Sequence, residues 1–179
     1  MKNFISTACL IGIFLFVSQV AEAAYVLPYP SYLPGNKLYK VSEFIDGIKK
    51  YWYFGTLTQL KYVQEMSDKH LVEAKTLFEY KQYALGVRAL VKSNSEVVQI
   101  SPLLSRLIEE KKSNPEIVKN VDEQMKSHVE VLTRMFSETP DSIEWTEERQ
   151  APRVINLNDF HTIAIQLRQE LRNYVIARL

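Results

Sequence analysis

Residues 56–91, TLTQLKYVQEMSDKHLVEAKTLFEYKQYALGVRALV, decide the fold of this chain. Apolar side chains recur in this stretch at spacings of three and four, which is the period of a helix that buries one face. The pattern breaks near Lys81 and Gln82 and then resumes, so the stretch predicts two helices joined by a short turn. The expected inward residues are Leu57, Leu60, Val63, Met66, Leu71, Ala74 and Phe78 in the first helix, and Ala84, Val87, Leu90 and Val91 in the second.

Local signals refine this helical pair. Thr56 is followed three residues later by Gln59, which has the form of a capping box and predicts that the first helix opens at Thr56. In the second helix, the small residues Gly86 and Ala89 allow the two helices to approach closely.

Two proline pairs mark helix starts on the C-terminal side. Ser101-Pro102 and Asn114-Pro115 each place a good cap before a proline at the first helical position. The first pair predicts a new or kinked helix, and the second predicts a further helix. The inward face of that further helix carries Val118, Val121, Met125, His128, Leu132 and Met135.

The C-terminal part predicts a long loop and a last helix. Residues 137–156 lose the helical period and predict a surface connection anchored by Trp145. Asn156 and Asp159 are placed like a cap and its partner at the start of the last helix. The seam of that helix carries Leu157, Phe160, Ala164, Leu167, Leu171 and Tyr174.

One more amphipathic helix precedes the central pair. It carries Val41, Phe44, Ile45, Ile48 and Trp52, and we expect it to end at Gly55. No stretch of useful length alternates like a strand. The predicted fold class is therefore all-α, a bundle of five to six helices in one domain over residues 38–179, with an extended proline-rich N-terminal arm.

Residues 1–23 have the build of a secretory signal peptide. Lys2 precedes the apolar run FISTACLIGIFLFV, and Ala21 and Ala23 form a small-x-small cleavage site. We expect cleavage after Ala23 and export to the periplasm or the extracellular space. The alternative is an uncleaved leader that acts as a membrane anchor, although the run is shorter than the ~20 residues of a membrane span. The only cysteine, Cys9, lies in the leader, so the exported chain has no disulfide and no thiolate metal site.

Residues 24–37 form an arm rich in proline and tyrosine. Pro28, Pro30 and Pro34 fix extended backbone angles, and a turn is expected near Gly35. We expect the arm to lie along the domain, with its Tyr and Leu side chains covering apolar surface. The alternative is a proline-rich ligand for an aromatic groove.

The arm and the central pair resemble DUF5667, a bacterial extracytoplasmic domain family of unknown function. The family pattern is an LPYPG-x-LPD-x-PLY opening followed by a helical pair, and the resemblance covers roughly residues 27–91. Departures from the pattern are Ser31, His70 and Tyr80. The resemblance implies export and a helical fold and implies no activity. The matching residues are Leu27, Pro28, Tyr29, Pro30, Leu33, Pro34, Leu38, Tyr39, Leu71, Glu73, Ala74, Leu77, Tyr83 and Leu90.

Candidate catalytic and metal-binding residues are few. A carboxylate-bridged metal centre needs a Glu-x-x-His pair on each of two helices, and this chain offers one His-x-x-Glu pair. We therefore predict no metal and no cofactor. No phosphate-binding glycine loop or G-x-S-x-G motif occurs, and a net charge of +1 gives no basic face for nucleic acid. The residues considered are Glu65, Asp68, His70 and Glu73 as a cluster, His128 as a core histidine, His161 as boundary packing, and Ser93 and Ser101 as turn and cap residues.

The sequence KKYWYF, residues 49–54, is the candidate interaction site. Neighbouring residues of a helix point about 100° apart, so one packing face cannot bury Tyr51, Trp52, Tyr53 and Phe54 together. Either the arm covers them, or they form a patch for another envelope protein or a membrane surface, since Trp and Tyr are suited to positions where one end of the side chain is in an apolar environment and the other end contacts water.

The function that these observations predict is an exported, non-enzymatic helical module with an interaction or structural role at the cell envelope. The alternatives are a periplasmic chaperone or stress-type helical protein, and a metal-binding protein or enzyme. A chaperone of this kind is expected to form a cradle-shaped dimer with a large concave face.

Overall fold

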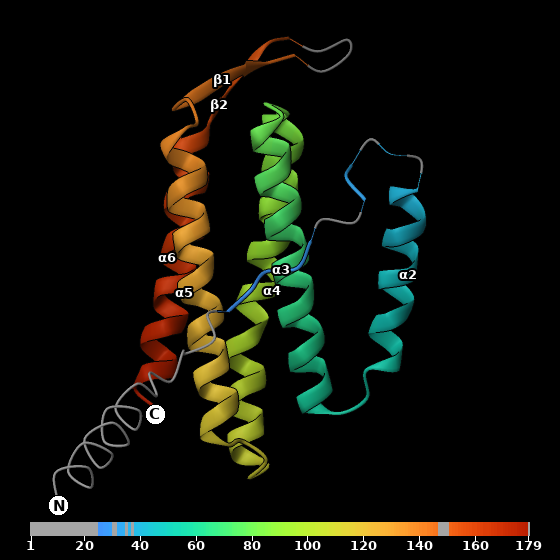
Figure 1. Ribbon diagram of the computed structural model, residues 1–179, viewed down its shortest axis with the longest axis vertical. Helices are drawn as coiled ribbons and strands as arrows, with labels where there is room; N and C mark the ends of the chain where they lie inside the picture. Colours follow the sequence, from blue (N-terminus) through green and yellow to red (C-terminus); the bar gives the residue numbers. More distant parts are fainter. Residues whose placement is uncertain (1–24, 30–31, 35, 37, 147–150, 179) are drawn as a thin grey trace, which may run out of the picture.

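The computed structural model of the chain describes residues 25–29, 32–34, 36, 38–146 and 151–178. It confirms the predicted all-α bundle, with five helices and one two-stranded sheet in these residues (Figure 1). The predicted signal peptide lies outside the described residues. The elements are α2 (Tyr39–Trp52), α3 (Thr56–Glu79), α4 (Tyr83–Glu109), α5 (Pro115–Ser137), β1 (Ser142–Trp145), β2 (Arg153–Asn156) and α6 (Leu157–Ile176).

Helices α3 to α6 form an up-down-up-down bundle. Helix α3 packs mainly on α4 and α5 mainly on α6, and α4 meets α6 where the two pairs join. The connections from α3 to α4 and from α4 to α5 are short, and the hairpin of β1 and β2 lies in the longer connection from α5 to α6. Helix α2 stands beside α3, on the side away from α5 and α6, while the hairpin of β1 and β2 lies at one end of the bundle (Figure 1).

The turn between α3 and α4 lies where the sequence predicts it. Lys81 adopts a positive φ of 58°, and the backbone N–H groups of Lys81 and Gln82 donate to the carbonyls of Phe78 and Leu77 at 2.9 and 2.8 Å. These bonds satisfy the last carbonyls of α3. A Cβ atom on Gly86 would lie 2.6 Å from Cδ2 of Phe78, so glycine permits the close approach of the two helices.

Of the two alternatives predicted at Ser101-Pro102, the start of a new helix is wrong, because α4 continues through Pro102. Proline removes the N–H group that would bind the carbonyl four residues earlier, which belongs to Val98. Both Pro102 and Val98 lie on the exposed side of α4, so water can reach the freed carbonyl. The helix start predicted at Asn114-Pro115 is confirmed. The side chain of Asn114 caps α5 by accepting a hydrogen bond from the N–H group of Ile117 at 2.8 Å.

The predicted capping box at Thr56 is also wrong. The N-cap of α3 is Gly55, with φ 91°, and no side chain caps this end of the helix. The Thr56 hydroxyl instead donates to Oε1 of Glu110 at 2.6 Å, which ties the start of α3 to the end of α4. This partner is far away in the sequence, so local spacing could not reveal it.

The predicted loop over residues 137–156 contains an antiparallel hairpin. Strands β1 and β2 pair with Ile143 opposite Ile155 and Trp145 opposite Arg153. Ile143 and Ile155 are half-buried and pack against the bundle core. Each strand has four residues, which is too short for the alternation to stand out in the sequence.

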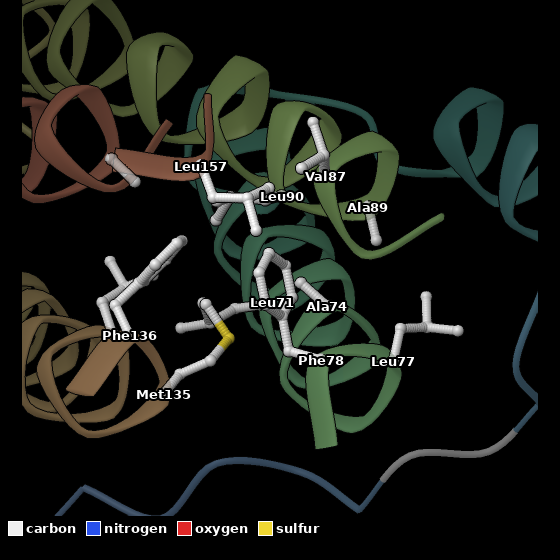
Figure 2. Packing of buried hydrophobic residues seen from close by; sticks show 12 residues of the cluster. Leu71, Ala74, Leu77, Phe78, Val87, Ala89, Leu90, Met135, Phe136 and Leu157 are labelled. Carbon is white, nitrogen blue, oxygen red and sulfur yellow. The ribbon is translucent and has the colours of Figure 1, made fainter. Parts of the chain in front are cut away.

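Two apolar clusters fill the bundle. The first core cluster lies next to the hairpin, where Met135 and Phe136 of α5 face Leu71 and Phe78 of α3 (Figure 2). The second core cluster fills the other half of the bundle and includes Leu60, Leu107, Val121 and Leu171. The predicted inward residues of α5 are all buried. The prediction that Val91 of α4 faces inward is wrong, because its side chain is 48% exposed.

The described part of the arm contacts the bundle. Leu27 and Leu33 pack against the first core cluster, and the hydroxyl of Tyr25 donates to Oδ2 of Asp68 at 2.6 Å. Of the helices in the described residues, none is both long and apolar enough to span a bilayer.

Candidate functional site

Helix α2 contacts the bundle with its polar side. The ammonium group of Lys69 on α3 binds the Asp46 carboxylate and donates to the Ser42 hydroxyl, the latter at 3.0 Å. The ammonium group of Lys92 on α4 binds the Glu43 carboxylate. Spacings of three and four put Ser42, Glu43 and Asp46 on one side of the helix. Both acidic residues of α2 are therefore paired with lysines of the bundle.

A buried carboxyl group lies beneath α2. Glu73 of α3 is 1% exposed, and burial raises the pKa of its carboxyl group. The hydroxyl of Tyr39 donates to Oε2 of Glu73 at 3.3 Å. Burial, together with the neighbouring Glu73 carboxylate, also raises the pKa of Tyr39. The contact between α2 and the bundle is thus polar and partly shielded from water.

The apolar side of α2 faces solvent. An amphipathic helix normally turns its apolar stripe toward the core, so this orientation is the reverse of the usual one. Positions 41, 44, 45, 48, 51 and 52 follow the helical period and form one continuous stripe. We call this stripe, with Phe54 after it, the outward face of α2. Its members and their exposed fractions are Val41 52%, Phe44 69%, Ile45 48%, Ile48 39%, Tyr51 76%, Trp52 75% and Phe54 83%.

The predicted patch at residues 51–54 is divided by the structure. Tyr51, Trp52 and Phe54 are exposed at the C-terminal end of the outward face. Tyr53 instead turns toward α3, where its ring centroid lies 5.1 Å from that of Tyr62. The described part of the arm contacts the first core cluster and Asp68, so the expected cover of this patch by the arm does not appear in that part.

The aromatic end of α2 also borders a cleft. The cleft is lined by Tyr51 of α2 and by Tyr53, which follows the helix. Tyr62, Glu96 and Arg106 line it from α3 and α4. Its volume is ≈ 520 Å³, which lies in the range of small-molecule pockets. The side chain of Tyr51 is therefore reachable both from the cleft and from the outward face.

A layer of polar side chains separates the two core clusters. His128 of α5 lies at its centre and is fully buried. Its Nε2 atom is 2.6 Å from Oδ1 of Asp68 on α3, and its Nδ1 atom is 3.2 Å from Nε of Arg168 on α6. Asp68 and Arg168 thus flank a histidine that bonds to both of them.

The hydrogen bonds fix the protonation state of His128. Arginine can only donate, so Nδ1 of His128 accepts from Arg168 and Nε2 carries the proton that is donated to Asp68. Burial lowers the pKa of His128 to about 4, against the opposing effect of the Asp68 hydrogen bond. Burial lowers the pKa of Arg168 to about 9, so its side chain keeps its charge at neutral pH. The layer contains a carboxylate, a neutral imidazole and a guanidinium group.

All four bundle helices contribute to this layer. Arg168 donates to Oδ1 of Asn94 at 2.7 Å, to Oγ of Ser93 at 2.8 Å and to the carbonyl of Ala164 at 2.9 Å. Gln124 donates to Oδ1 of Asp68 at 2.6 Å. The predicted turn position of Ser93 is wrong, because Ser93 is a buried residue in the middle of α4.

Most residues of this layer are not predicted by the sequence. The exception is Arg168, whose position on the buried seam of α6 can be recognised from the spacing of apolar residues. Arg168 lies four residues after Ala164 and three before Leu171, both of which are on the buried seam of α6. A charged residue at a seam position predicts a buried partner. The partners themselves, Asp68 and His128, lie on other helices and could not be paired with it from local spacing.

The carboxylate-histidine cluster of α3 considered as a metal site, for which the sequence predicts no metal, is separated in the structure. His70 lies 3.2 Å from Oε2 of Glu96 on α4, whereas Asp68 belongs to the polar layer. His161 stacks on Phe136 with the ring centroids 4.4 Å apart, and burial lowers its pKa. In the part of the chain that the structure describes, no group of three or more His, Cys, Asp or Glu side chains is arranged to hold a metal ion. Both ring nitrogens of His128 already have partners, and in this conformation neither can reach a substrate.

Comparisons with known proteins give no match: no family model, no curated protein and no solved structure matches the chain. The resemblance to DUF5667 therefore rests on the residues quoted above.

Proposed function

We propose that this protein is an exported, non-enzymatic helical module that docks to another component of the cell envelope through the outward face of α2. Export follows from the predicted signal peptide, with cleavage after Ala23 and release of the domain into the periplasm or the extracellular space. The resemblance to DUF5667 is part of this proposal, because that family is extracytoplasmic and has no assigned activity.

The observation that supports docking is the orientation of α2. Its acidic residues are paired inward with Lys69 and Lys92, while its apolar stripe faces solvent. Large contiguous apolar patches on a protein surface mark interaction sites. A helix of this length is marginally stable alone, so a partner on the outward face would stabilise it.

Photo-crosslinking in the producing cells tests this function. A photoreactive amino acid replaces Phe44 or Ile48 on the outward face, and Val98 on α4 serves as the matched control because it is also an exposed apolar residue. We expect adducts with an envelope protein or lipid from positions 44 and 48, and none from position 98. The same yield of adducts from all three positions would overturn the proposal. This readout holds whether the leader is cleaved or retained.

A further inference from the structure

The outward face of α2 is bordered by lysines on both sides. Lys40 lies one turn before Phe44, and Lys49 lies one turn after Ile45, so at 100° per residue they border opposite edges of the stripe. Both lysines are exposed, and the side chain of Lys49 is 52% exposed.

The acidic side chains of α2 point away from the outward face. Of the described side chains of α2, the acidic ones are Glu43 and Asp46, and both are paired on the bundle side. Lys49 lies 3.7 Å from the Asp46 carboxylate, which Lys69 already binds. The outward side therefore combines apolar side chains with positive charge. A complementary partner surface is negatively charged where it meets the two lysines and apolar where it meets the stripe.

This charge pattern disfavours a second copy of the chain as the occupant. Two outward faces packed together would bring lysines against lysines, with the acidic residues of α2 on the far sides. Like charges placed together in an interface destabilise it.

The aromatic end of α2 suits a membrane surface. Tyr51, Trp52 and Phe54 are all exposed there, and tryptophan and tyrosine are enriched where lipid headgroups meet the acyl chains. A helix of 14 residues is about 21 Å long, which is too short to cross a bilayer but suited to lie along it. Helices that lie in this interface have an apolar face and lysines on their polar side.

We propose that the occupant of the outward face is a membrane surface that contains anionic lipid, with α2 parallel to the bilayer. This inference rests on the proposed function and names its partner. Phe44 and Ile48 enter the boundary between headgroups and acyl chains, Lys40 and Lys49 reach the headgroup phosphates, and the bundle remains on the aqueous side.

Vesicle binding of the purified protein tests this inference. Trp145 is replaced by Phe, so that Trp52 is the remaining tryptophan and reports on the environment of the outward face. Vesicles of phosphatidylcholine alone are compared with vesicles of phosphatidylcholine and phosphatidylglycerol. We expect a blue shift of the Trp52 emission with the anionic vesicles, a weaker shift with the zwitterionic ones, and weaker binding as salt is added.

Two pairs of variants separate the apolar and the electrostatic contributions. Phe44→Ser is expected to lose most of the binding, whereas Val98→Ser keeps it. Lys40→Gln is expected to weaken binding to the anionic vesicles about fivefold, which corresponds to about 1 kcal/mol per lysine. Lys126→Gln, at an exposed position of α5, serves as its control. Circular dichroism confirms that each variant keeps its helices.

The outcomes distinguish this inference from the docking function itself. Absence of binding to the anionic vesicles, or binding that Phe44→Ser and Val98→Ser reduce equally, overturns the membrane inference. If crosslinks from position 44 then lead to an envelope protein, the docking function stands and its partner is that protein. If position 44 also gives no specific crosslink, both proposals fail.

Discussion

The most informative perturbation of the fold is the replacement of Arg168 by alanine. The guanidinium group is fully buried and donates to His128, Asn94, Ser93 and a backbone carbonyl. Its loss leaves these acceptors without a donor and leaves the Asp68 carboxylate without the positive charge that shares its layer. A cavity of the size of the side chain is created as well.

The magnitude follows from these contacts. An orphaned buried polar group costs about 1–3 kcal/mol, and removal of one member of a buried charge pair costs about 3–5 kcal/mol. These contributions overlap because the groups belong to one network. We therefore expect Arg168→Ala to lower the free energy of unfolding by about 3–5 kcal/mol, a large share of the total stability of a domain of this size.

Urea denaturation followed by circular dichroism measures this change, with Arg172→Ala as the matched control on the same helix. Arg172 binds Asp122 at 2.7 Å in a pair whose side chains are 29% and 21% exposed, so its loss is expected to cost about 1 kcal/mol or less. Where Arg168→Ala does not fold, Arg168→Lys keeps a charge and is expected to fall between the two. Equal losses for Arg168→Ala and Arg172→Ala would refute the interpretation of the layer as a coupled buried network.

Three further predictions concern single contacts. Tyr25→Phe removes a hydrogen bond to a buried carboxylate and is expected to lower the free energy of unfolding by about 1.5–3 kcal/mol, whereas Tyr29→Phe, at a position that is 94% exposed, should change little in the same urea titration. The folded pKa of His128, about 4, is below the unfolded value of 6.5, so the unfolded state takes up the proton first, and the contribution of His128 should lower the stability by about 3 kcal/mol from pH 6.5 to pH 4. The loss of stability over this range should therefore be smaller in His128→Gln by about that amount, and an equal loss in both proteins would contradict a buried neutral histidine. Gly86→Ala forces a Cβ against the ring of Phe78 and should lower the melting temperature. Gly47→Ala meets nothing within 4 Å and should raise the melting temperature, because alanine has the higher helix propensity. Changes of the same sign would count against the close approach of α3 and α4 at Gly86.

Features that depend on neighbours in sequence could be predicted well. The cap at Asn114 and the turn at Lys81 depend on residues within a few positions, and both lie where the sequence places them. The periodic inward face of α5 is likewise buried as expected. Such features are decided by backbone geometry and by the spacing of apolar residues.

Features that depend on distant partners could not be predicted. The partner of Thr56 is Glu110, and the position of Ile143 depends on its pairing with Ile155. The continuity of α4 at Pro102 depends on its exposure at the bundle surface, which local sequence does not determine.

The orientation of α2 is the main example of this limit. Its sequence shows an apolar stripe but not the direction in which the stripe points. That direction is set by the contacts of Glu43 and Asp46 with Lys92 and Lys69, which lie on two other helices. The candidate site therefore extends from Tyr51, Trp52 and Phe54 over the whole outward face of α2, and only the three-dimensional contacts reveal it.

The orientation of α2, with its polar side toward the bundle and its apolar side toward solvent, can be tested by thiol labelling. In a Cys9→Ala background the chain has no other thiol, so Phe44→Cys and Ser42→Cys each provide a single reporter, on the outward face and on the bundle side. In the folded protein without vesicles, we predict fast labelling at position 44 and slow labelling at position 42, with equal rates in urea. Faster labelling at position 42 than at position 44 would show that α2 packs with its apolar side and would contradict both the outward face and the docking function proposed for it.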